Sequence, residues 1–198
     1  MSSKPPAQIT DTRSVAIAAA RLLFLTRGLE ATRIEDVRDA SGISTGSLYH
    51  HFGSKLGLLE AVVLSALSDH KRALLEALPV DLSAQDAVRM LIATTASWIS
   101  ENADAARCIF RFRGALESAG STALKTHNRN ELSPLLKRLE GWIEKDEIRA
   151  LPMALLLPLL HGPLHEYARA WLAGRVDLPP SAYVEVFVAA AWAALKPQ

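Results

Sequence analysis

The chain has little of several features that mark other classes of protein. It contains one cysteine, Cys108, which excludes an intrachain disulfide and a multi-cysteine metal site. Its most apolar stretch, Leu151 to Leu160, is too short to span a bilayer and is interrupted by two prolines. The N-terminus lacks the basic-then-apolar order of a signal peptide. These absences predict a cytoplasmic protein that does not enter the membrane, with Cys108 as an inert core thiol.

An excess of charge of one sign is also missing. The 198 residues include 22 Lys+Arg and 21 Asp+Glu, which leaves a net charge of +1. A nucleic-acid-binding protein of this composition must concentrate its positive charge locally. Basic residues do gather in the first 55 positions, but acidic residues nearly balance them there. Charge alone therefore gives no indication of DNA binding.

The motifs of common enzyme classes are absent. The sequence has no Gly-rich phosphate loop, no Gly-x-Ser-x-Gly and no His-Glu-x-x-His, and nothing orders its Ser, His and Asp residues into a triad. We therefore expect no enzyme and no cofactor, although an enzyme is the competing class. His161 and His165 have the i, i+4 spacing that can clamp a metal, but Glu166 should point to another face. We expect no metal site.

Apolar residues recur at helical spacing along the chain, and no strand alternation or internal repeat interrupts them. This pattern predicts an all-α protein of about nine helices. The most informative stretch is Thr32 to Lys55, TRIEDVRDASGISTGSLYHHFGSK. It predicts two short helices joined by a tight turn at Gly42, where a helix end favours a left-handed residue. A third helix begins after Ser54. Gly57 lies in its first turn, where a poor helix former such as glycine lowers the stability of the helix only slightly.

Local signals define both short helices. Thr32 and Glu35 have the spacing of a capping box, in which each side chain satisfies a free backbone N–H. Ser44 or Thr45 caps the second helix. The inner face of that helix carries Leu48, with Phe52 four residues further on. This pattern predicts a helix-turn-helix, in which the second helix is free to enter a major groove. The alternative is an ordinary helical hairpin.

The run GISTGSLYHHFGSK resembles the signature of the TetR (tetracycline repressor) family of bacterial transcription regulators. The resemblance covers about the first 70 residues, and it is specific because turn, second helix and Ser-Lys entry occur together in order. It implies a DNA-binding domain over residues 10–70, with the helix-turn-helix at about 33–52. It also implies a ligand-sensing and dimerisation domain over residues 79–198. Arg38, where the family commonly has a small residue, puts the packing of the first short helix in doubt.

The outer face of the second short helix is small, polar and nearly uncharged, which suits an approach to base edges. Its hydroxyl and imidazole groups can donate to or accept from bases, and Gly46 lets the backbone come close. The candidates for base contacts are Thr45, Ser47, Tyr49 and His50.

The resemblance also implies phosphate contacts, which position a protein without reading sequence. Lys55 adds charge to a helix N-terminus that already attracts phosphate. The alternatives are that Thr32 only caps its helix and that Tyr49 packs against the preceding long helix. We expect His51 to face inward. The complete predicted DNA-binding set is Thr32, Arg33, Ser44, Thr45, Gly46, Ser47, Tyr49, His50, Ser54 and Lys55.

The resemblance implies that the C-terminal domain senses a small molecule. Aromatic side chains with a few polar groups are what an apolar ligand pocket needs. The alternative for each of them is an ordinary place in the core. The candidates are Trp98, Phe110, Phe112, Trp142, His161, His165, Tyr167 and Trp171.

The last expected helix, residues 181–195, is apolar nearly all round and must be covered on most sides. Its apolar and small residues include Tyr183, Val186, Phe187, Ala190, Ala191 and Ala194. The resemblance implies a homodimer through the last two helices, and the alternative is a monomer with this helix in its own core.

The implied function is a dimeric repressor that releases double-stranded operator DNA when an unknown effector binds. A further alternative is a dimeric ligand-binding protein whose N-terminal domain no longer binds DNA.

Overall fold

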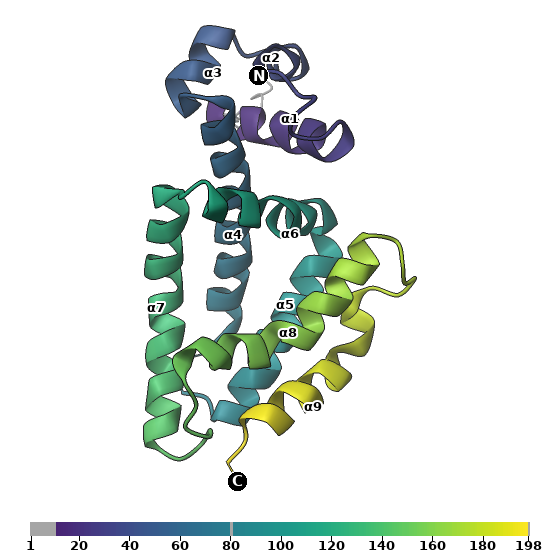
Figure 1. The fold of residues 1–198 in the computed structure, drawn as a ribbon. Coiled ribbons are helices and arrows are strands. Elements are labelled where there is room, and N and C mark those ends of the chain that lie inside the picture. Colours follow the sequence, from purple (N-terminus) through teal and green to yellow (C-terminus); the bar gives the residue numbers. More distant parts are fainter. Residues whose placement is uncertain (1–10, 80, 198) are drawn as a thin grey trace, which may run out of the picture. The chain divides into compact units, whose positions relative to one another are not determined.

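The computed structural model describes residues 11–79 and 81–197 (Figure 1). Every regular element in these ranges is a helix, which confirms the all-α prediction. Residue 10, where the expected DNA-binding domain starts, and Val80 in the second expected domain lie outside the described residues. The helices are α1 (Thr12–Thr26), α2 (Ile34–Ser41), α3 (Thr45–Phe52), α4 (Lys55–Ala77), α5 (Ala84–Glu101), α6 (Ala103–Ser118), α7 (Thr122–Glu144), α8 (Met153–Leu172), the 3-10 helix η1 (Pro180–Tyr183) and α9 (Val184–Leu195).

The chain divides into two compact units, residues 1–65 and 66–198, and α4 begins in the first and ends in the second. No helix of the described ranges combines the length and apolar character needed to cross a membrane.

The first unit packs α1, α2, α3 and the start of α4 around a small core. Phe24 of α1, Val37 of α2 and Leu48 of α3 are each almost completely buried, together with Leu58 and Leu59 of α4. Burial of a side chain of this size stabilises a fold by about 1.5–3 kcal/mol. These few contacts therefore fix the angle between α2 and α3.

The second unit is built on α5, which contacts α6, α8, η1 and α9. Figure 1 shows α8 and α9 side by side, and the two helices share a core with α5. On α9 the buried residues are Phe187, Val188, Ala191 and Leu195. Val186 and Ala190 of the same helix are exposed. The helix is so uniformly apolar that the spacing of its residues does not identify its inner face.

Candidate nucleic-acid interface

The turn between α2 and α3 has the predicted geometry. Gly42 adopts a left-handed conformation with φ 71°, and its N–H donates to the carbonyl oxygen of Arg38 at 2.8 Å. The hydroxyl of Ser44 accepts from the backbone N–H of Ser47 at 3.2 Å and thereby caps α3. Both predictions, the glycine turn and a cap at the start of α3, are confirmed.

The start of α2 differs from the prediction. Arg33 is the N-cap residue, and its backbone N–H donates to the Asp36 carboxylate at 2.7 Å. Thr32 is 0% exposed, and its hydroxyl donates to the carbonyl oxygen of Gly28 at 2.7 Å. The predicted Thr32–Glu35 capping box is therefore wrong by one residue. The Thr32 side chain holds the connection between α1 and α2, and its burial leaves it no access to a phosphate.

The outer face of α3 carries the predicted polar groups. Tyr49 is 48% exposed, His50 is exposed, and nothing lies within 4 Å of a Cβ added at Gly46. At 100° per residue, Thr45, Gly46, Tyr49 and His50 share one face of the helix. This face is polar, has little bulk at Gly46, and carries no carboxylate that would repel a phosphate.

His51 is a residue of this surface that the sequence reasoning missed. The expectation that it faces inward is wrong, because it is exposed and its ring lies 5.5 Å from that of His50. It is four residues after the partly exposed Ser47, so the two lie on the same side of α3. His51 is only three residues after the buried Leu48, so helical spacing alone places it on the inner side and does not identify it.

The start of α4 is also fixed by hydrogen bonds. The hydroxyl of Ser54 accepts from the N–H of Gly57 at 3.0 Å and thereby caps α4. The Lys55 ammonium donates to the carbonyl oxygen of Leu29 at 3.0 Å and remains partly exposed. Arg38 is exposed and pairs with Asp39 at 2.8 Å, so this departure from the family pattern leaves the packing of α2 undisturbed.

The eight predicted pocket residues lie in different parts of the second unit. Trp98, Phe110 and Trp171 belong to one small apolar cluster. Trp142 and Tyr167 belong to the larger core of α5, α8 and α9, and the Tyr167 hydroxyl donates to the carbonyl oxygen of Leu178 at 3.0 Å. Phe112 is buried, with the guanidinium of Arg111 over its ring at 5.3 Å.

His161 and His165 stack with their ring centroids 5.3 Å apart, and they lie near two residues that were not predicted. We call His70, Thr95, His161 and His165 the histidine cluster. An imidazole nitrogen of His70 lies 3.2 Å from the Thr95 hydroxyl, and its ring lies 4.8 Å from that of Trp98. His161 is partly exposed as a residue, but its Nε2 atom is shielded from solvent and lacks a hydrogen-bond partner among the described residues.

The histidine cluster is uncharged at neutral pH. Burial lowers the pKa of His161 to about 3 and the pKa of His70 to about 4, and the nearby His165 adds to both shifts. The pKa of His165 is lowered to about 4. Burial is the largest cause, and the positive charges of Arg169 and Arg113 add to it. In the described ranges no group of three His, Cys, Asp or Glu side chains is arranged to hold a metal ion.

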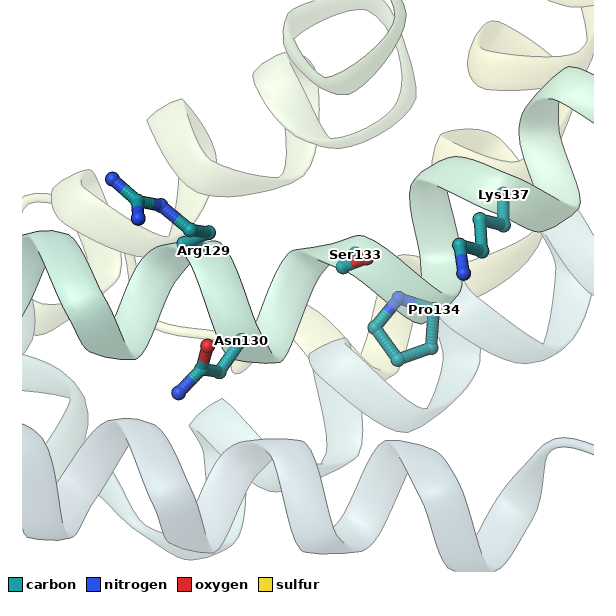
Figure 2. Close-up of a pocket in the computed structure, with 5 residues that line it drawn as sticks. All are labelled: Arg129, Asn130, Ser133, Pro134 and Lys137. Atoms are coloured by element: carbon teal, nitrogen blue, oxygen red, sulfur yellow. The ribbon is translucent and has the colours of Figure 1, made fainter.

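A depression on α7 does not coincide with the histidine cluster. Its volume is about 540 Å³, and its lining residues all come from this one helix: Arg129, Asn130, Ser133, Pro134 and Lys137. Figure 2 shows Arg129 and Asn130 extending from different sides of α7, so the lining side chains do not converge on one point. The depression contains no predicted pocket residue and lacks the enclosing apolar walls of a ligand site.

The sequence of the first unit matches a known family. The profile of bacterial regulatory proteins of the tetR family matches residues 16–62. The transcriptional repressor KstR2 of Rhodococcus jostii is 42% identical over 69 residues, which are 33% of this chain and 34% of that protein. The repressor BdcR of Escherichia coli is 32% identical over 94 residues, 48% of each chain. The chain thus spans between a third and a half of the length of these curated relatives.

The likeness in fold extends over nearly the whole chain. A TetR family transcription regulator from Marinobacter aquaeolei has a TM-score of 0.80 at 20% identity, covering 94% of this chain and 96% of its own. The ketosteroid transcriptional regulator KstR2 of Mycobacterium tuberculosis has a TM-score of 0.67 at 20% identity, covering 98% and 100%. The described chain therefore has the all-helical fold of these solved structures. Residues 16–62 resemble the DNA-binding domain of regulatory proteins of the tetR family.

Proposed function

We propose that this protein is a ligand-responsive repressor that binds operator DNA through α3 and releases it when a small molecule binds the second unit. The observation that carries the proposal is the outer face of α3, where hydroxyl and imidazole groups are exposed while Leu48 fixes the inner face. Base edges in a major groove are recognised by such donors and acceptors.

The residues divide by what they contact. Thr45, Tyr49 and His50 face the bases, and Gly46 permits the close approach. Ser47 and the newly identified His51 lie at the edge of this surface. Phosphate contacts fall to Arg33, Ser54 and Lys55, which sit at helix starts where backbone N–H groups also attract anions. Ser44 and Thr32 act indirectly, by capping α3 and by fixing the start of α2.

A gel-shift assay with DNA upstream of the protein's own gene tests the proposal. We expect a shift that weakens as salt rises, because phosphate contacts release counterions. Tyr49→Ala should weaken binding by about 1–3 kcal/mol, or roughly tenfold to a hundredfold, as expected for one lost base contact. Its melting temperature should stay unchanged, because Tyr49 is 48% exposed. Lys125→Ala, an exposed change on α7, is the control and should bind like the parent.

The absence of a salt-sensitive, sequence-dependent shift with any promoter fragment would refute the regulator proposal. Equal affinity of Tyr49→Ala and the parent would leave the regulator proposal standing but would remove Tyr49 from the base-contacting face.

The regulator we propose is a homodimer through α8 and α9. One α3 reaches few bases, whereas two related by a two-fold axis reach half-sites about 34–36 Å apart. Val186 on α9 is 62% exposed, and Leu155 on α8 is 46% exposed. Three exposed alanines, Ala189, Ala190 and Ala193, extend the apolar face around Val186. An apolar helix face of this kind favours a partner over water.

Val186→Asp should convert the dimer to the 21.5 kDa monomer in light scattering and abolish the gel shift at concentrations where the parent is fully bound. The introduced carboxylate would be buried without a partner in the interface. Leu75→Asp is the matched control, since Leu75 is 57% exposed on α4. A dimer that persists in Val186→Asp would place the interface elsewhere.

The coupling between ligand and DNA would run through α4. This helix carries Lys55 at its start and His70 in the part that belongs to the second unit. A ligand at the histidine cluster would therefore contact the helix that also supports the phosphate-binding end of the first unit. If the ligand binds more tightly to an arrangement of α4 that does not bind DNA, it weakens DNA binding. The size of the effect equals the difference in the ligand's affinity for the two arrangements.

A further inference from the structure

We propose that the histidine cluster recognises the effector, and that the effector is an uncharged, largely apolar molecule carrying a hydroxyl or a carbonyl group. The inference rests on the proposed function, in which the second unit binds a small molecule. It adds the chemical class of that molecule and the side chains that select it.

The polar groups of the cluster converge from three helices within one unit. His70 comes from α4, Thr95 from α5, and the stacked His161 and His165 from α8. Aromatic rings flank them. Trp98 lies 4.8 Å from His70 and, on α6, Phe110 lies 5.5 Å from His165, measured between ring centroids. A few hydrogen-bonding groups among apolar walls are the composition of a small-molecule site.

The Nε2 atom of His161 lacks a hydrogen-bond partner among the described residues. It is also shielded from solvent. Nearly all buried polar atoms of native proteins are paired, and an unpaired one destabilises the fold. A neutral imidazole nitrogen can donate or accept, depending on the tautomer. A hydroxyl or a carbonyl oxygen of a bound molecule would therefore satisfy it equally.

The surroundings select an uncharged group. The four side chains of the cluster include no carboxylate, so an ammonium would find no counter-charge among them. The nearest cations, Arg113 and Arg169, are already paired with Glu117 at 2.9 Å and Glu166 at 3.2 Å. Because the imidazoles are neutral at pH 7, a carboxylate would also lack a charged partner unless one of them took up a proton.

Calorimetry with the full chain at pH 7.5 tests this selection with probes that share one skeleton. The probes are 2-naphthol, 2-acetylnaphthalene, 2-naphthoate and 2-methylnaphthalene, with 1-octanol, octanoate and octane as a linear series. In at least one series we expect the uncharged oxygen compounds to bind about tenfold more tightly than both the anion and the hydrocarbon, as one hydrogen bond to a buried group allows. Preference for the anion, or no binding in either series, would overturn the proposal.

Variants assign the preference to the cluster. His161→Phe keeps a planar ring but removes the nitrogens, so the hydroxyl compound should bind no better than the hydrocarbon. Thr95→Val removes the hydroxyl at nearly constant volume and should reduce the preference for the hydroxyl compound. This second variant keeps the test decisive if His161→Phe does not fold. Lys125→Ala, an exposed change on α7, is the control and should keep the preference. Retention of the full preference in both cluster variants would also overturn the proposal.

The calorimetry is done without DNA. Its outcome therefore tests the class of effector independently of whether the protein binds DNA. A protein that prefers the hydroxyl compound but shifts no promoter fragment would contradict the regulator proposal alone. A protein that shifts its promoter but prefers the carboxylate would contradict the effector class alone.

Discussion

Lowering the pH from 7 to 5 should reduce the free energy of unfolding of the second unit by about 5 kcal/mol through three histidines. In the folded chain the pKa of His161 is lowered to about 3, and the pKa values of His70 and His165 to about 4. In the unfolded chain the pKa of histidine is about 6.5. The unfolded chain therefore takes up protons below pH 6.5 while the folded chain does not. The loss begins near pH 6.5 and stops growing below the folded-state values.

The measurement is urea unfolding at pH 7, 6 and 5, followed by tryptophan fluorescence. All four tryptophans lie in the second unit, at positions 98, 142, 171 and 192, so the signal reports on that unit. His161→Phe removes one of the three titrating groups and should reduce the loss between pH 7 and pH 5 by about 2 kcal/mol. An equal loss in this variant and in the parent would show that His161 is already solvated in the folded protein.

The histidine cluster shows how far a sequence predicts such a site. His161 and His165 were predicted together, because residues four apart on one helix always lie near each other. Neither Thr95 nor His70 was predicted as a residue of this site. His70 and Thr95 lie more than sixty residues before His161 in the sequence. Helical spacing identifies the inner face of one helix but not which face of another helix packs against it.

The first unit was predicted more completely because its signals are local. Gly42 and Ser44 lie within a few residues of the backbone groups they satisfy, so the turn and the cap of α3 follow from the sequence. The error at Thr32 has a different origin. A hydroxyl at that position fits a helix cap, but here it bonds to Gly28 across the connection from α1. A competing tertiary hydrogen bond cannot be read from the spacing of Thr32 and Glu35.

Gly57→Ala should destabilise the first unit and weaken DNA binding, although glycine in the first turn of a helix was expected to matter little. A Cβ at this position would overlap the carbonyl oxygen of Phe52. That oxygen cannot move freely, because it also accepts from the N–H of Ser54 at 2.8 Å. Overpacking of this kind destabilises by about 1–3 kcal/mol. Relief requires the end of α3 to move relative to α4, which would misplace the outer face of α3.

Hydrogen exchange of the α2 and α3 amides, together with the gel shift, measures this effect. Gly46→Ala is the matched control on α3, because nothing lies within 4 Å of the added Cβ. Gly46→Ala should slow exchange slightly, since alanine is favoured over glycine in a helix by about 0.5–1 kcal/mol. Any loss of DNA affinity in this variant would come from the added methyl group on the outer face of α3. Gly57→Ala should accelerate exchange throughout α3. Unchanged exchange and affinity in Gly57→Ala would mean that the turn between α3 and α4 adjusts without moving α3.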